Sequence, residues 1–169
     1  MEKISLFDVN ARPLGRTAIR NRYQWAEGEY HISAELWIAD SQNRFLCQLR
    51  SAQKSKFPLM WAESAGGCGG VNEDFLACII RETQEELGLT ICPAELIDLG
   101  RETRTHDLKQ TYLLKKDINI SELKLQKEEV SQVAWLSYTQ IETKIRNRQF
   151  VPTVVNGLQL AARKLGIIG

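Results

Sequence analysis

Three glutamates in one short segment are the residues of this chain best suited to chemistry. The segment reads Arg81-Glu-Thr-Gln-Glu-Glu86, with carboxylates at Glu82, Glu85 and Glu86. At about 100° per residue in a helix, these side chains lie within an arc of roughly 100°, beside the apolar face. Three carboxylates gathered there are explained if a divalent cation sits among them, Mg²⁺ or Mn²⁺ rather than zinc. The alternative is a solvated acidic helix face on which Arg81 pairs with Glu85.

A glycine-rich stretch precedes this segment. Gly66-Gly-Cys-Gly-Gly70 has four glycines in five residues, which predicts a loop that needs unusual backbone angles or close approach, and neither a helix nor a packed strand. The backbone N–H groups of Gly66 and Gly67, leading toward a helix N-terminus, are typical of a site for phosphate oxygens. The alternative is a simple tight turn. Acidic face and glycine stretch together provide what phosphoryl transfer needs, a metal that neutralises charge and a positioned water.

Basic residues upstream are candidates for contacts with the same phosphates. Arg50 ends a predicted strand, and Lys54 and Lys56 lie in the polar loop that follows it. We expect Arg50 and Lys54 to bind substrate beside the glycine stretch. The alternative is a solvated loop.

The predicted helix over residues 73–87 positions the glutamates. Asn72 is a plausible N-cap, acidic residues occupy the first turn, and Gly88 is placed to end the helix. One face carries apolar residues at helical spacing. That face is expected to pack against the sheet: Phe75, Leu76, Ile79, Ile80, Thr83 and Leu87.

The remaining elements predict the fold class. Strand-forming runs surround the one central helix, and more helix follows at the end. This order predicts an α+β protein, an α/β/α sandwich around a mixed β-sheet, in a single domain over residues 1–169. We divide it into an N-terminal extension (1–30), a core (31–137) and C-terminal helices (138–169). The expected strands are 4–9, 17–23, 31–39, 45–50, 95–104, 110–116 and 130–136, and the expected later helices are 138–147 and 152–165.

Composition limits the partners. The 22 basic and 21 acidic residues leave a net charge of +1, so neither nucleic acid nor a membrane surface is expected as a partner. No apolar run approaches the roughly 20 residues of a membrane span, and the first ten residues lack a signal-peptide core. The four cysteines form no C-x-x-C pair. They predict reduced thiols and a cytoplasmic protein.

The glutamate segment resembles the motif of the Nudix hydrolases, G-x5-E-x7-R-E-U-x-E-E-x-G-U, where U is aliphatic. All fixed positions match, and Thr83 is the one departure, at a position that is usually aliphatic. The matching residues are Gly67, Glu73, Arg81, Glu82, Glu85, Glu86, Gly88 and Leu89. The resemblance implies Mg²⁺- or Mn²⁺-dependent hydrolysis of a phosphoanhydride bond in a nucleoside diphosphate linked to another group.

The same resemblance implies roles for the residues. Glu82, Glu85 and Glu86 would be the metal ligands, and Arg81 would orient their carboxylates. Members of the family often use a further glutamate from a later loop, before a strand that carries a tryptophan. Glu129, six residues before Trp135, is the candidate, and Glu128 is its rival. A solvated charge is the alternative for either residue.

A second resemblance concerns a branch of this family, the isopentenyl diphosphate isomerases. It rests on His31-Ile-Ser-Ala-Glu-Leu-Trp37 and Trp61-Ala-Glu-Ser-Ala65. Gly66 stands where the isomerase needs its cysteine, and Cys68 where it has a metal-binding histidine, so isomerase activity is not expected. A non-catalytic nucleotide sensor is the other alternative, which the intact glutamates argue against. The expected partner is a small diphosphate substrate. Homodimers are common in the family, but nothing in the chain decides between a homodimer and a monomer.

Overall fold

The computed structural model describes residues 2–169, and a seven-stranded mixed sheet forms its centre. The strands are β3 (His31–Ala39), β4 (Phe45–Arg50), β5 (Trp61–Ala62), β6 (Ala65–Cys68), β7 (Leu96–Thr103), β8 (Asp107–Lys115) and β9 (Val130–Leu136). β3 is the middle strand, parallel to β8 and antiparallel to β4 and β6. β5 and β9 pair with β4, and β7 pairs with β8, all antiparallel.

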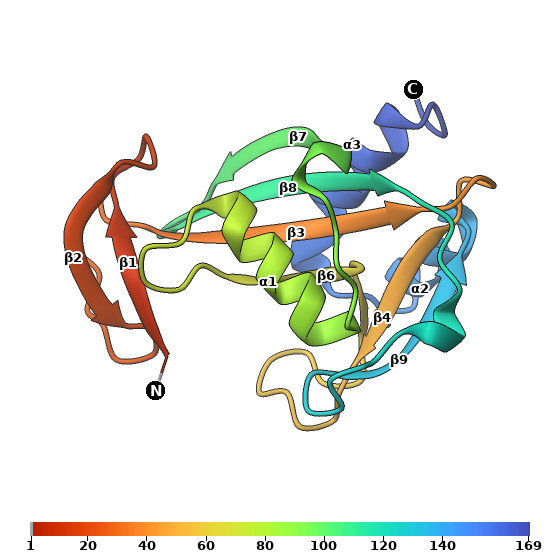
Figure 1. Cartoon of the computed structure of the whole chain (residues 1–169), viewed down its shortest axis with the longest axis horizontal. Coiled ribbons are helices and arrows are strands. Elements are labelled where there is room, and N and C mark those ends of the chain that lie inside the picture. Colours follow the sequence, from red (N-terminus) through yellow and green to blue (C-terminus); the bar gives the residue numbers. More distant parts are fainter. Residues whose placement is uncertain (1) are drawn as a thin grey trace.

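Helices cover both faces of this sheet (Figure 1). α1 (Phe75–Leu87) packs on one face, and α2 (Tyr138–Arg146) and α3 (Val155–Lys164) pack on the other. Alternate residues of β3 supply the two cores, because successive side chains of a strand point to opposite faces. Leu36 and Ile38 face α1, whereas Trp37 and Ala39 face α3. The predicted α/β/α sandwich around a mixed sheet is therefore confirmed.

The N-terminal segment forms a separate small sheet. β1 (Lys3–Phe7) pairs antiparallel with β2 (Pro13–Ile19) and lies at one end of the molecule (Figure 1). The two strands were expected at 4–9 and 17–23, so the second one begins four residues earlier than predicted. Among residues 2–169, no helix is both long and apolar enough to cross a bilayer.

The glycine stretch is the main correction to the predicted fold. Residues 65–68 form strand β6, which pairs with β3 instead of forming a loop. None of its glycines has a positive φ. Of the two expected reasons for the glycines, close approach is the one that applies: a Cβ on Gly67 would collide with the Glu82 carboxylate, and a Cβ on Gly66 would lie 2.8 Å from Glu63 Oε1 and 3.0 Å from the Ala34 carbonyl.

The start of α1 is a second correction. Asp74, and not Asn72, is the N-cap, with its side chain accepting a hydrogen bond from the Ala77 N–H at 2.7 Å. Asn72 lies two residues earlier, in the left-handed region with φ 62°. At the other end, Gly88 has φ 65° and donates its N–H to the Gln84 carbonyl, as predicted for the residue that ends the helix. The C-terminal pair of helices also forms, although Pro152–Val154 is a short 3₁₀ turn before α3.

Candidate active site

Arg81 organises the acidic residues at the start and on the exposed side of α1. Its Nη1 donates to Glu82 at 2.9 Å and to Glu85 at 3.0 Å. Its Nε and Nη2 donate to Glu73 at 2.7 and 2.9 Å, and Nη2 also reaches the Cys68 carbonyl at 2.9 Å. These charge-assisted bonds lower the pKa of Glu73. One guanidinium therefore fixes the end of β6 and three carboxylates of the motif.

Glu86 is the buried member of the set, with 3% of its surface exposed. Its Oε2 accepts hydrogen bonds from Gln48 Nε2 at 3.0 Å and from the Gly66 N–H at 3.2 Å. Burial, together with the nearby carboxylates of Glu82 and Glu63, raises the pKa of Glu86 to about 8. Gln48 Oε1 is buried without a hydrogen-bond partner. Among residues 2–169, no lysine or arginine forms an ion pair with Glu86.

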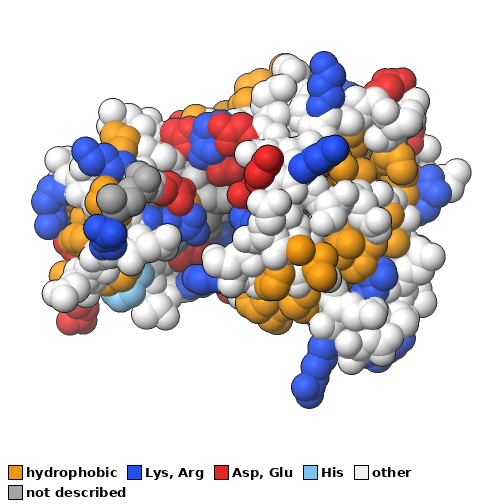
Figure 2. Space-filling model, turned by 90° about the horizontal axis from the view of Figure 1, so that it is seen from below, with side chains coloured by type: hydrophobic (Ala, Val, Ile, Leu, Met, Phe, Trp, Pro, Cys, Tyr) orange, Lys and Arg blue, Asp and Glu red, His pale blue; other side chains and the backbone are white. Residues whose placement is uncertain are grey.

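These glutamates share a cavity of about 340 Å³ with basic residues from other segments. Its lining includes Gly66, Gly67, Glu82, Glu85, Glu86, Glu129, Lys54 and Arg20. Lys54 forms an ion pair with Glu129, whereas Glu128 is exposed and does not line the cavity. Glu129 is therefore the later-loop glutamate that reaches this site. Figure 2 shows acidic and basic side chains gathered in the hollow between the β1–β2 hairpin and the main body.

The donor chemistry of this cavity fits a hard divalent cation. Its carboxylates supply only oxygen, which Mg²⁺ and Mn²⁺ prefer, and no histidine lines it. In the part of the chain that the structure describes, however, no three acidic, histidine or cysteine side chains converge as a metal site. Arg81 Nη1 is hydrogen-bonded to Glu82 and Glu85, whereas Glu86 is hydrogen-bonded to Gln48 and the Gly66 N–H.

One of the two backbone N–H groups expected to bind phosphate is already bonded to a carboxylate of the chain. The Gly66 N–H is used by Glu86, and the N-terminus of α1 is capped by Asp74. Gly66 and Gly67 instead form a wall of the cavity, where the missing side chains make room for carboxylates. Lys54 lines this cavity, whereas Arg50 lines a neighbouring one.

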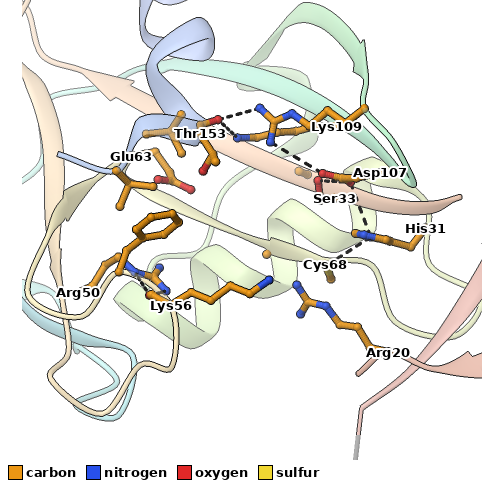
Figure 3. A pocket seen from close by; sticks show the side chains of 16 residues that line it. Arg20, His31, Ser33, Arg50, Lys56, Glu63, Cys68, Asp107, Lys109 and Thr153 are labelled. Atoms are coloured by element: carbon orange, nitrogen blue, oxygen red, sulfur yellow. Dashed lines mark hydrogen bonds and ion pairs between the residues drawn. The ribbon is translucent and has the colours of Figure 1, made fainter. Parts of the chain in front are cut away.

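The neighbouring cavity, of about 310 Å³, lies on the other side of β6 residues Gly67 and Cys68 (Figure 3). Five cationic side chains line it: Arg20, Arg50, Lys56, Arg104 and Lys109. Glu63 and Asp107 are its acidic residues. Sequence reasoning did not select Arg20, Glu63, Arg104 or Lys109. Glu63 does fall within the Trp61–Ala65 segment that carries the second resemblance, but no spacing rule links it to α1.

Behind this cavity lies a buried polar cluster on β3 and β8. Glu35 accepts a hydrogen bond from Thr111 at 2.9 Å and forms an ion pair with Lys109. Burial raises the pKa of Glu35 to about 7, although Lys109 opposes the shift. Gly157 of α3 lies so close that a Cβ there would collide with the Glu35 carboxylate.

Cys68 behaves as a buried structural thiol. Burial raises its pKa to about 12, so the thiol stays protonated. Its Sγ lies 3.4 Å from Nδ1 of His31, whose pKa is lowered by burial.

Comparison with known proteins places this geometry in a family. The NUDIX domain model matches residues 29–154. The chain belongs to the Nudix family. It is 30% identical over 158 residues to an uncharacterised Nudix hydrolase of Listeria monocytogenes, which covers 90% of this chain and 89% of that protein. The Nudix hydrolase family predicted from the motif is therefore confirmed.

Two further comparisons concern the branch and the fold of this Nudix chain. An isopentenyl-diphosphate Delta-isomerase of Streptomyces griseus is 29% identical over 116 residues, covering 69% of this chain and 57% of that protein. The similarity to that branch is confirmed. A crystal structure from Deinococcus radiodurans superposes with a TM-score of 0.77 at 20% identity, covering 93% of this chain and 96% of that one. At that identity the likeness supports the fold alone.

Proposed function

We propose that this Nudix protein hydrolyses a phosphoanhydride bond of a small diphosphate substrate and requires Mg²⁺ or Mn²⁺. The observation that carries the proposal is one cavity in which Glu86 is buried beside Glu82 while Lys54 and Arg20 supply positive charge. A site of this kind suits a phosphate–metal complex, because the cation offsets the carboxylates and the basic side chains offset the phosphate oxygens. A nucleoside diphosphate linked to another group is the substrate class that the family resemblance predicts.

Glu82, Glu85 and Glu86 would hold the cation. Bound there, it would neutralise phosphate charge and lower the pKa of a coordinated water. Arg81 acts as a positioning residue, since its guanidinium bonds to Glu82 and Glu85 fix the side of α1 from which these carboxylates reach the cavity. Gln48 and the Gly66 N–H do the same for Glu86.

The reaction places one water oxygen on phosphorus. A new P–O bond forms, the bridging P–O bond breaks, and the leaving phosphate departs with the electron pair of that bond. A carboxylate of the cavity, Glu129 or one of the glutamates of α1, accepts the proton of the water. Lys54 and Arg20 bind the non-bridging oxygens. The products are two phosphate monoesters, or a nucleotide and pyrophosphate when the substrate is a triphosphate.

The test is product analysis by mass spectrometry, with purified protein, Mg²⁺ or Mn²⁺, and a panel of diphosphates in H₂¹⁸O. We expect one class of compound to be cleaved with a single ¹⁸O in one phosphate product. Glu86→Gln and a chelator should each abolish turnover. Tight binding of a compound that is not cleaved with either Mg²⁺ or Mn²⁺ would contradict the proposal and favour a nucleotide sensor.

A further inference from the structure

The cavity on the far side of β6 contains cations that have no carboxylate partner. Arg50 donates from Nε and Nη2 to the Lys56 carbonyl at 3.2 and 3.0 Å. No Asp or Glu side chain among residues 2–169 forms an ion pair with Arg50. The Lys56 ammonium likewise forms no ion pair with any residue from 2 to 169. By contrast, Lys109 is paired with Glu35, and Arg104 with Glu102. The cavity is thus lined both by cations that are paired with a carboxylate, Lys109 and Arg104, and by cations that are not, Arg50 and Lys56.

Arg20 connects the two cavities. Its side chain lines both, and its one ion pair is with Glu2 near the surface, at 3.0 Å. Figure 3 shows Arg20 and Lys56 extending toward one another across the space beside Cys68, with Arg50 next to the base of Lys56. Three cations from three segments therefore line the neighbouring cavity, and one of them, Arg20, also lines the glutamate cavity. Concentrated positive charge in a recess favours a multiply charged anion.

The opposite wall carries hydrogen-bond acceptors. Glu63 has a buried Oε2 without a partner, and Asp107 accepts from Ser33 Oγ at 2.7 Å. These oxygens repel an anion, so its place is beside Arg50 and Lys56 and not beside Glu63. Phe57 is the one Phe, Tyr or Trp among the residues that line the cavity. A nucleobase would find little aromatic surface to stack on, whereas a charged group finds direct partners.

We propose that Arg50, Lys56 and Arg20 form a second anion subsite, and that the substrate carries an additional phosphate or carboxylate beyond the diphosphate that reacts. The proposal rests on the proposed function for the position of the reacting diphosphate in the glutamate cavity. The extra anion then lies across β6, and Arg20 lies between the two charged groups. Substrates with a neutral group at that end leave Arg50 and Lys56 unpaired and bind more weakly.

The first experiment measures the subsite without catalysis. Isothermal titration with inorganic phosphate and, separately, with acetate is done in EDTA, so that no metal contributes to binding. The proteins are wild type, Lys56→Gln, Arg50→Gln and the matched control Lys164→Gln, an exposed residue at the end of α3. We expect both subsite variants to weaken phosphate binding at least about tenfold, the loss of one charge-assisted contact, and the control to match wild type. No binding, or equal binding by all four proteins, overturns the proposal. The acetate arm shows whether a carboxylate can replace the phosphate.

The second experiment uses two dinucleotides with the same diphosphate, NADH and NADPH, which differ by one phosphate. With Mg²⁺, we expect Lys56→Gln to lower kcat/KM for NADPH at least about tenfold and for NADH less than about threefold. An equal loss for both compounds overturns the subsite. If neither compound is hydrolysed, the proposed hydrolysis fails for this pair, while the phosphate titration still decides the subsite.

Discussion

The two cavities on either side of β6 differ in charge and in how the chain builds them. The acidic cavity takes its three motif carboxylates from one 13-residue helix, α1. The basic cavity draws its cations from the end of β2, the end of β4, the loop after it, and the β7–β8 hairpin. One is therefore set by helical spacing and the other by the tertiary fold. Under the proposed function, the acidic cavity holds the groups that react, and the basic cavity binds a further charged group of the substrate.

The largest expected effect is on the acidic side. Glu86→Gln should lower kcat by about 10³-fold or more, because a lost metal ligand removes several kcal/mol of charge stabilisation in the transition state. The metal-free variant should melt at the wild-type temperature or higher, since the amide needs no compensating charge in this buried position. Steady-state kinetics and calorimetry check both parts. A large loss of activity together with a lower melting temperature would instead mean that Glu86 supports the fold.

A second change tests the wall that the cavities share. Gly67→Ala should lower kcat about tenfold to a hundredfold, because the new Cβ displaces the Glu82 carboxylate and small displacements of a positioned group are costly. Gly70→Ala is the matched control, where the nearest atom to a new Cβ is Glu73 Oε2 at 3.4 Å. We expect the control to keep near-wild-type rates. Equal losses in both variants would show that the glycines serve only the backbone.

A third change addresses the basic side. Arg50→Gln should raise KM for a substrate with an extra anion by about tenfold, the loss of one charge-assisted contact, and change kcat by less than about threefold. Arg50→Lys keeps the charge and should recover part of the loss. A fall in kcat at unchanged KM would place Arg50 with the reacting groups and remove the distinction between the cavities.

The smallest effect concerns stability behind the basic cavity. Burial raises the pKa of Glu35 from 4.5 to about 7, so the folded state holds this proton more tightly than the unfolded chain does. The contribution of Glu35 to the unfolding free energy should therefore fall by about 1–3 kcal/mol as the pH rises from about 4.5 to about 7. Urea denaturation across this range measures the slope, which should be smaller in Glu35→Gln. Parallel curves for the two proteins would contradict the assignment to Glu35.

The same contrast explains what could be predicted from the sequence. The α1 glutamates, Arg81 and Gly88 follow from spacing along one helix, and the β3–β4 hairpin follows from alternation and turn residues. Strand β6 could not be predicted, because its glycines are needed to leave room for the carboxylates of Glu82 and Glu63, which pack against them. Such packing is a property of distant residues. Arg20 and Lys109 could not be predicted for the same reason. The β3–β8 pairing brings Lys109 to the basic cavity, and the position of the β1–β2 hairpin brings Arg20 there.

Arg20 follows directly after β2, ahead of the residues 29–154 that match the family. The β1–β2 hairpin that carries it is a sheet of its own. Insertions, deletions or exchanges in this appendage would alter the charge that borders both cavities while leaving the strands and helix that hold the glutamates as they are. Substrate preference can therefore change through the exposed end of this hairpin, whereas Phe7 of β1, which packs with Ile32 and Leu108, has to stay in place to keep the hairpin attached to the core.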